Sequence, residues 1–141
     1  MASIIKTVET VAPVGVAWSA VRDIGALHTR LVPGFVTNTV VEDDARVVTF
    51  ANGSVVREPI ISIDDEHRRL VWSAETEVHD HYNGAAQVIG QPDGTTVVVW
   101  TADFKPDALA DYMDEMMTAG AEAMKAALDA AAEDAHRTAP A

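Results

Sequence analysis

The last quarter of the chain, residues 106–132, is the feature that most limits what this sequence can fold into. Apolar residues recur there at three- and four-residue spacing, which is typical of a helix that buries one face. Alanine, leucine, methionine, lysine and glutamate dominate, so intrinsic preference also favours helix. Asp107 is a suitable N-cap, and acidic residues follow in the first turns. We therefore expect one long amphipathic helix, against which the rest of the chain must pack.

Flexible and small residues occupy the apolar face of this expected helix. Four methionines lie on it, and methionine side chains fill irregular space and tolerate a changing neighbour. Gly120 lies in the middle, where glycine costs about 1 kcal/mol relative to alanine. Either these residues complete an irregular core, or something needs the room that a larger side chain would take.

Composition limits the classes of function. The 141 residues suffice for one domain with a core of its own. Lys and Arg number 10 against 22 Asp and Glu, a formal charge of -12, which disfavours nucleic acid and anionic membrane surfaces as partners. There is no cysteine, so disulfides and thiolate zinc sites are excluded. The sequence has neither a signal-like start nor a run of 18 apolar residues, so we expect a cytoplasmic protein with no membrane insertion. We expect it to be a monomer or a homodimer.

Hydrophobic alternation and turn residues divide the remaining chain into short elements. We expect one domain over residues 1–134 and a frayed tail over 135–141. Within the expected strand 55–63, Pro59 indicates either a sheet edge or a local irregularity. The expected strands and helices are strands at 3–11, 35–42, 46–51, 55–63, 70–76, 81–90 and 95–104, short helices at 13–23 and 25–31, and the long helix.

Antiparallel strands joined by tight turns bury one face by curling, and the long helix is the natural cover for the concave side. The sequence therefore predicts an α+β fold with a seven-stranded curled antiparallel sheet around a long C-terminal helix and two short helices after the first strand. This order resembles the helix-grip domains of the SRPBCC superfamily, which includes START lipid-transfer domains, the birch-pollen allergen and polyketide cyclase/dehydrase-like proteins. The resemblance is carried by Ala12-Pro13, Ala17-Trp18, Val21-Arg22-Asp23, Pro33-Gly34, Gly53, Arg57-Glu58, Ile63-Asp64-Asp65, Thr96-x-Val98-x-Trp100 and residues 120–125.

The resemblance implies a deep apolar cavity between the sheet and the long helix. It implies a small hydrophobic or amphipathic ligand that is polyketide-, lipid- or isoprenoid-like, held without a metal or nucleotide cofactor. The alternative is an enzyme of the polyketide cyclase or dehydratase type. A partner-binding adaptor is a third possibility, but no exposed apolar stripe argues for it.

Strand parity indicates which side chains would face such a cavity. Small residues at inward positions, such as Gly84 and Gly120, would leave volume that large aromatic residues surround. His28 is expected near the mouth, although a surface role is the commoner one for such a histidine. The predicted ligand-binding residues are His28, Leu31, Val48, Phe50, Val56, Glu58, Trp72, Tyr82, Gly84, Trp100, Tyr112, Met116 and Gly120.

Glu58 is the candidate catalytic residue. If Val56 and Ile60 point inward, Glu58 between them does too, and a buried carboxylate must be paired, hydrated or protonated. Three roles remain open at this point: it orients a ligand, it pairs with a buried arginine such as Arg46, or it transfers a proton together with Tyr82 or His28.

Glu77, His79 and His81 have the composition of a two-histidine-one-carboxylate metal site. On a strand they would share one face, at spacing i, i+2 and i+4. However, they span an expected loop, and His81 faces outward if Tyr82 faces inward. We therefore interpret them as a polar hairpin with exposed imidazoles and predict no metal site.

Overall fold

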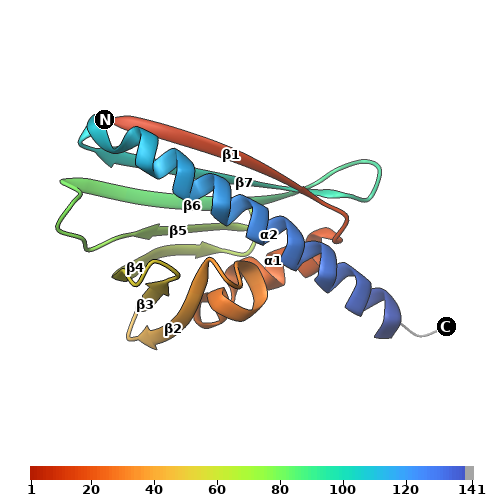
Figure 1. Cartoon of the computed structure of the whole chain (residues 1–141). Coiled ribbons are helices and arrows are strands. Elements are labelled where there is room, and N and C mark those ends of the chain that lie inside the picture. The colour runs from red at the N-terminus through yellow and green to blue at the C-terminus, as the bar shows by residue number, and fades with distance from the viewer. Residues whose placement is uncertain (139–141) are drawn as a thin grey trace.

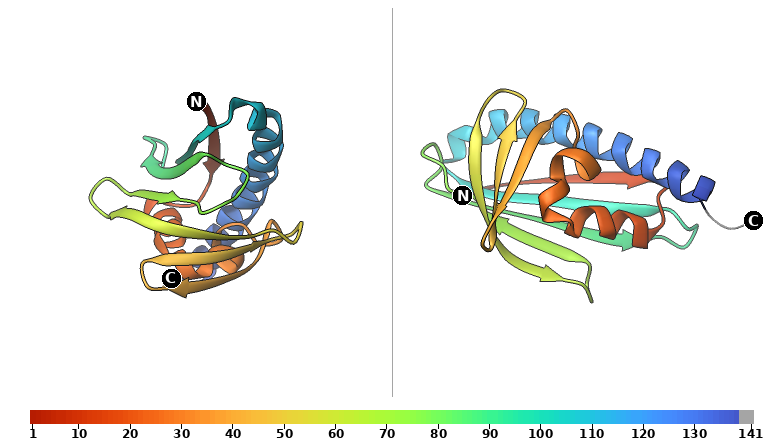
Figure 2. Two further views of the ribbon diagram at one scale, coloured as in Figure 1. Left: turned by 90° about the vertical axis from the view of Figure 1, so that its left-hand side faces the viewer. Right: turned by 90° about the horizontal axis from the view of Figure 1, so that it is seen from below.

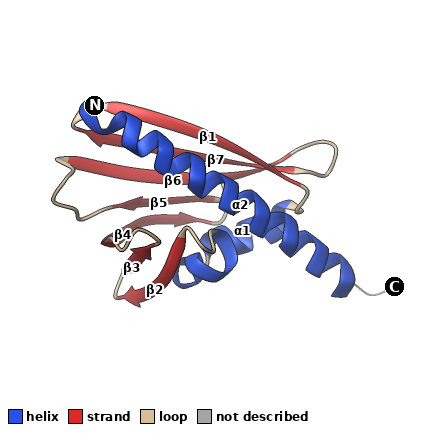
Figure 3. Cartoon of the chain, in the orientation of Figure 1, coloured by secondary structure: helices blue, strands red, loops and turns tan. Residues whose placement is uncertain are grey.

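The computed structural model describes residues 1–138, and the side chains of residues 1–136. Within them the chain forms these elements in order: β1 (Ala2–Thr10), α1 (Val14–Arg22), η1 (Ile24–Ala26), η2 (Leu27–Leu31), β2 (Val36–Glu42), β3 (Ala45–Phe50), β4 (Val55–Asp64), β5 (Arg69–Ser73), β6 (His81–Gly90), β7 (Thr96–Lys105), η3 (Asp107–Leu109) and α2 (Ala110–Thr138). Figure 1 shows them along the chain, and Figure 3 separates helices from strands.

The strands form a single seven-stranded antiparallel sheet in the order β1-β7-β6-β5-β4-β3-β2. Helix α2 packs against β1 and crosses the concave side of the sheet in front of β7 and β6 (Figure 1). The strands β2 and β3 run across the direction of α2, and α1 with η1 and η2 lies beside them (Figure 2). The predicted α+β architecture of a curled sheet around a terminal helix is confirmed.

The sheet bends within β4, at Pro59. Residues Val55–Pro59 pair with β3, whereas Ile60–Asp64 pair with β5, and the register shifts between Ile60 and Ser62. Proline cannot donate a ladder hydrogen bond, so it favours a break at this point. Pro59 therefore marks an irregularity in a strand that lies between two others, and the alternative of a sheet edge is wrong.

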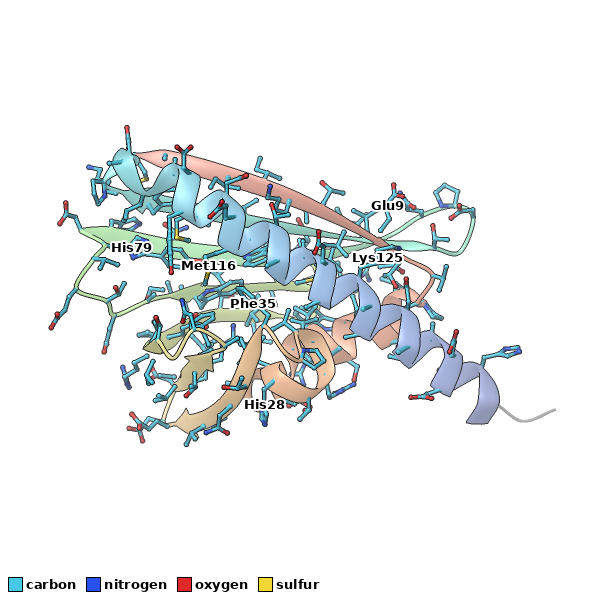
Figure 4. All side chains as sticks on the ribbon, in the orientation of Figure 1. Glu9, His28, Phe35, His79, Met116 and Lys125 are labelled. Carbon is cyan, nitrogen blue, oxygen red and sulfur yellow. The ribbon has the colours of Figure 1, made fainter. Side chains whose placement is uncertain are left out.

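The C-terminal half of α2 is fastened to the end of β1. Lys125 Nζ donates to the carbonyl oxygen of Glu9 at 2.8 Å, and Figure 4 shows the two residues together. Asp129 Oδ1 accepts hydrogen bonds from Thr10 Oγ1 at 2.6 Å and from the N–H of Val11 at 3.1 Å. These bonds fix the helix at one end of the sheet, where Met124 and Leu128 are buried in the main core.

Two glycines admit tryptophan rings into the interior. A Cβ on Gly120 would lie 2.8 Å from Trp100 Cη2, and a Cβ on Gly84 would lie 2.5 Å from Trp72 Cε2. The expectation that Gly84 and Gly120 leave empty volume is therefore wrong, because indole rings from neighbouring elements occupy that space. Strand and helix periodicity cannot reveal this, since the rings come from elsewhere in the chain.

The boundaries of the long helix also differ from expectation. Regular α-helix begins at Ala110, and Asp107 provides no side-chain cap but pairs with the N-terminal amino group at 3.1 Å. The helix continues to Thr138, beyond the expected end at Ala132, so residues 135–138 belong to α2. The remainder of that tail, residues 139–141, lies outside the described residues.

We predict that Gly120→Ala destabilises the protein although alanine is the better helix former. The new methyl group would force the Trp100 ring to shift, and such overpacking costs about 1–3 kcal/mol. Gly15→Ala in α1 is the matched control, because nothing lies within 4 Å of its Cβ position, and we expect a gain of up to about 1 kcal/mol. Urea denaturation measures both; equal effects at the two positions would contradict the prediction.

Candidate functional site

A cavity of about 1080 Å³ lies between the first turns of α2 and the sheet. Its lining comes mainly from α2, from β4, β6 and β7, and from the loop between β5 and β6, with further residues from β3, from η3 and from the segment before β2. The α2 side contributes Tyr112, Met113, Met116 and Met117, and the sheet side contributes Val56, Glu58, Tyr82 and Trp100. Figure 4 shows Met116 and His79 at this end of the molecule.

A second hollow of about 60 Å³ lies deeper, toward Leu31 and Met124. The two hollows share one set of lining residues, which therefore stands between them: Phe35, Phe50, Glu58, Tyr82 and Trp100. We call the larger hollow the outer cavity and the smaller one the inner hollow.

The edge of the outer cavity exposes large apolar side chains to solvent. Val55 from β4, Val78 from the β5–β6 loop and Tyr112 from α2 are 62%, 63% and 43% exposed. Exposed apolar groups that surround a hollow are typical of a binding site for an apolar molecule. We call these three side chains the rim; they form an apolar border around the entrance of the outer cavity.

The charged groups on the wall of the outer cavity are all carboxylates: Glu58, Glu75 and Glu77. No lysine or arginine among the described residues lines it. Glu75 is paired with Arg57, whose Nη1 lies 3.0 Å from Glu75 Oε1, and Glu58 is paired with Arg46. Anionic groups are thus disfavoured at this wall, whereas neutral ones are not.

Glu58 and Arg46 form a buried ion pair between adjacent positions of β4 and β3. Arg46 Nε lies 2.9 Å from Glu58 Oε1, and the two residues are 3% and 7% exposed. The Arg46 guanidinium also lies over the Trp72 ring, 5.3 Å from its centre. Burial raises the pKa of Glu58, and the charge and hydrogen bond of Arg46 oppose that rise. Of the roles left open by the sequence, pairing with Arg46 is the one that the geometry forms.

His79 lies in the β5–β6 loop and turns into the cavity wall. Its ring stacks edge-on against Tyr82 and Phe104, with ring centres 5.3 and 6.1 Å apart. Both ring nitrogens are buried and have no hydrogen-bond partner among the described residues. Desolvation lowers the pKa of His79, so the neutral imidazole is favoured. The expectation of an exposed imidazole is wrong here because the loop folds back over the cavity.

His81 does face outward, as predicted, and its Nε2 lies 2.7 Å from Asn83 Oδ1. The described residues contain no group of three His, Asp or Glu side chains arranged to hold a metal ion. Tyr82 projects into the cavity, where burial and the negative charge of Glu58 raise the pKa of its hydroxyl. The phenol therefore stays protonated. Trp100 Nε1, from β7, is buried and unpartnered like the nitrogens of His79.

The structure brings most, but not all, of the predicted ligand-binding residues together. Those on the outer cavity are Phe50, Val56, Glu58, Tyr82, Trp100, Tyr112 and Met116. Leu31 and Trp72 line the inner hollow alone. Four residues line neither hollow: His28, Val48, Gly84 and Gly120.

The four residues outside the hollows have other surroundings. His28 Nδ1 lies 3.1 Å from Thr39 Oγ1, and the residue lies on η2, away from the first turns of α2 (Figure 4). Val48 is completely buried in the core. The two glycines lie against the tryptophan rings described above.

Sequence reasoning missed the β5–β6 loop, whose residues 74–79 all line the outer cavity. It missed Phe35 as well. Leu109, Met113 and Met117 lie on the apolar face expected for the long helix, but they were not among the predicted ligand-binding residues. Helical spacing contains the signal for those three residues. No periodicity predicts how an irregular loop folds back, so the loop had no such signal.

A curled antiparallel sheet that wraps a long C-terminal helix, with a hollow between them, defines the helix-grip class of proteins. The family model described as "Polyketide cyclase / dehydrase and lipid transport" matches residues 1–136. The chain belongs to this family, and the superfamily resemblance seen in the sequence is confirmed. A comparison with curated protein sequences finds no match.

Solved structures share the fold at low sequence identity. The protein XoxI from Bacillus cereus has a TM-score of 0.80 and 17% identity, covering 91% of this chain and 96% of its own. A START superfamily protein from Mycobacterium smegmatis has a TM-score of 0.70 and 12% identity, covering 94% and 97%. Norcoclaurine synthase from Thalictrum flavum, in complex with dopamine and hydroxybenzaldehyde, has 0.72 and 18%, covering 99% and 89%. None of the helices in residues 1–138 is long and apolar enough to cross a membrane.

We predict that Arg46→Met destabilises the protein strongly, because it leaves Glu58 buried without its counter-charge. Breaking a buried pair from one side costs about 3–5 kcal/mol. Arg57→Met is the matched control in the same sheet, since its partners Glu42 and Glu75 are exposed, and it should cost less than about 1 kcal/mol. Chemical denaturation at neutral pH compares them; similar losses would show that the Arg46–Glu58 pair contributes no more than a surface pair.

We predict that His79 makes the protein less stable in mild acid. Its pKa is lower in the folded state, so below the ordinary value of 6.5 the unfolded chain binds the proton more readily. The stability contributed by the neutral ring is present above that value and is lost as the pH falls toward the lowered pKa. The melting temperature of the wild type should therefore fall more than that of His79→Phe on going from about pH 7.5 to about pH 5.5. Parallel pH profiles would refute this.

Proposed function

We propose that the protein binds a small hydrophobic or amphipathic molecule, polyketide-, lipid- or isoprenoid-like, in the outer cavity. The observation that carries this proposal is the cavity of about 1080 Å³, with its aromatic and methionine lining. Cavities of roughly 300–1000 Å³ hold molecules of drug size, so this one has room for several fused rings or a folded chain. The family description, which includes lipid transport, supports the proposal.

The composition of the lining also supports an apolar ligand. Met113, Met116 and Met117 face aromatic side chains across the cavity, and methionine adapts its shape to different neighbours. The exposed rim of Val55, Val78 and Tyr112 offers an apolar entrance. A ligand that covers this rim would remove apolar surface from water, at roughly 25 cal/mol per Å².

Binding is favoured over catalysis of the cyclase or dehydratase type. A general acid or base must exchange a proton near neutral pH, which suits a carboxyl group with a raised pKa. Burial raises the pKa of Glu58, and Arg46 offsets only part of that rise. However, Arg46 Nε holds Glu58 Oε1 at 2.9 Å, so this carboxyl group is already paired within the wall. We therefore propose that Glu58 supports the cavity wall and is not the group that transfers a proton.

The test uses the neutral fluorescent probe N-phenyl-1-naphthylamine. The wild type should bind it with an increase in probe emission, and Met116→Trp should weaken binding at least tenfold, about 1.4 kcal/mol, because the larger indole projects into the cavity and blocks part of the space that the probe occupies. Ala126→Trp is the matched control, since Ala126 lies on the exposed side of the same helix, and its affinity should equal that of the wild type. Failure of the wild type to bind, or equal weakening by both substitutions, would contradict the proposal.

A further inference from the structure

One carboxylate oxygen of Glu58 opens toward the interior space of the protein. The hydrogen bond from Arg46 Nε reaches Oε1, and no described side chain, Tyr82 included, donates to Oε2. The Glu58 side chain keeps 9% of its surface accessible, and it lines both the outer cavity and the inner hollow. Among the described residues, buried side-chain atoms with neither a partner nor accessible surface occur only at His79 and Trp100. Oε2 is not one of them, so it meets the space beside it.

This oxygen is held in a fixed position. The register of β3 and β4 sets Arg46 directly opposite Glu58. The guanidinium is fixed in turn, because it lies over the Trp72 ring, 5.3 Å from the ring centre. Glu58 is one of the residues common to both hollows, so Oε2 stands where the outer cavity meets the inner hollow.

Arg46 also determines which kind of partner this oxygen needs. An arginine side chain stays protonated in proteins, and Glu58 is its acidic partner. Burial raises the pKa of Glu58, but protonation would leave the guanidinium buried without a counter-charge, which is costly. The ionised form of Glu58 is therefore favoured. An ionised carboxylate accepts hydrogen bonds and donates none, so Oε2 requires a donor.

The donor that fits this position is uncharged. A cationic amine at Oε2 would share one carboxylate with the Arg46 guanidinium, and the two like charges would repel each other where water is scarce. A hydroxyl group donates a hydrogen bond and brings no charge. The aromatic and methionine side chains of the outer cavity fit an apolar skeleton around that group.

We propose that the ligand is an apolar molecule with a hydroxyl group that donates a hydrogen bond to Glu58 Oε2, where the outer cavity meets the inner hollow. This inference rests on the proposed function and adds to it the class of ligand. A ligand whose only polar atom is a carbonyl or ether oxygen would displace water from Oε2 and return no hydrogen bond, which weakens its binding.

The probes are 9-fluorenol, 9-fluorenone and fluorene, which share one ring skeleton. Fluorenol carries a hydroxyl donor, fluorenone carries only an acceptor, and fluorene carries neither. Displacement of N-phenyl-1-naphthylamine gives their affinities. The wild type should bind fluorenol at least about tenfold more tightly than fluorenone, because hydrogen bonds to charged groups are the stronger ones. The cation 9-(aminomethyl)fluorene should bind more weakly than fluorenol.

Glu58→Gln tests the oxygen itself. The amide oxygen would accept from Arg46 Nε in place of Oε1, which turns the amide NH₂ toward the hollows and replaces an acceptor with a donor. This variant should bind fluorenone at least as tightly as fluorenol, while its fluorene affinity changes by less than about twofold. Glu42→Gln is the matched control, because it removes the same charge from an exposed residue that lines neither hollow, and it should keep the wild-type preference. Circular dichroism shows whether each variant is folded.

A measurement on the unaltered protein keeps the proposal testable if Glu58→Gln does not fold. Crystals of the wild type are soaked in 2-bromo-9-fluorenol, and the bromine, located by anomalous diffraction, fixes the orientation of the rings. The hydroxyl oxygen should lie about 2.5–3.0 Å from Glu58 Oε2.

The outcomes separate this inference from the proposed function. The inference is overturned if the wild type does not prefer fluorenol to fluorenone, if it binds the amine more tightly, or if its preference persists in Glu58→Gln. A soaked hydroxyl directed away from Glu58 would overturn it as well. Fluorene binding that Met116→Trp weakens would leave the proposed function standing in those cases. If no probe binds the wild type, both proposals fail.

Discussion

The contact between Gly120 and the Trp100 ring lies at the boundary between the packed core of this molecule and its outer cavity. On its C-terminal side, α2 is bonded to β1 through Lys125 and Asp129 and buries Met124 and Leu128 in the core. On its N-terminal side, the helix faces the outer cavity with methionines and a tyrosine. One close approach, which only glycine permits, therefore separates the half of the helix that packs on the main core from the half that covers the hollow.

A hollow of this size has a physical cost. Interior side chains next to empty space lose dispersion contacts, and large cavities destabilise folded proteins in proportion to their volume. The unpartnered nitrogens of His79 and Trp100 add to that cost. The long β6–β7 and β1–β7 ladders and the core around Leu128 offset it at the opposite end. An arrangement that is costly when empty is one that a fitting ligand stabilises.

The sequence predicted features that depend on local periodicity and missed those that depend on contacts between distant elements. Residue spacing alone predicts the order of the strands along the chain and the apolar face of α2. It also predicts that Tyr82 and Trp100 point inward. The occupancy of space beside Gly84 depends on Trp72 in the adjacent strand, and the burial of His79 depends on a loop that folds back. Glu58 was recognisable as an inward carboxylate with Arg46 as a possible partner, and the β3–β4 register was needed to select pairing among its three possible roles.

The presence of a vacant cavity that accepts a guest is tested most directly by soaking crystals of the protein in 1-bromonaphthalene and locating the bromine by anomalous diffraction. The predicted result is a bromine signal in the outer cavity, within about 4 Å of Met116, Tyr82 or Trp100. Electron density in which the side chains themselves fill that space, with no bromine signal there, would contradict it.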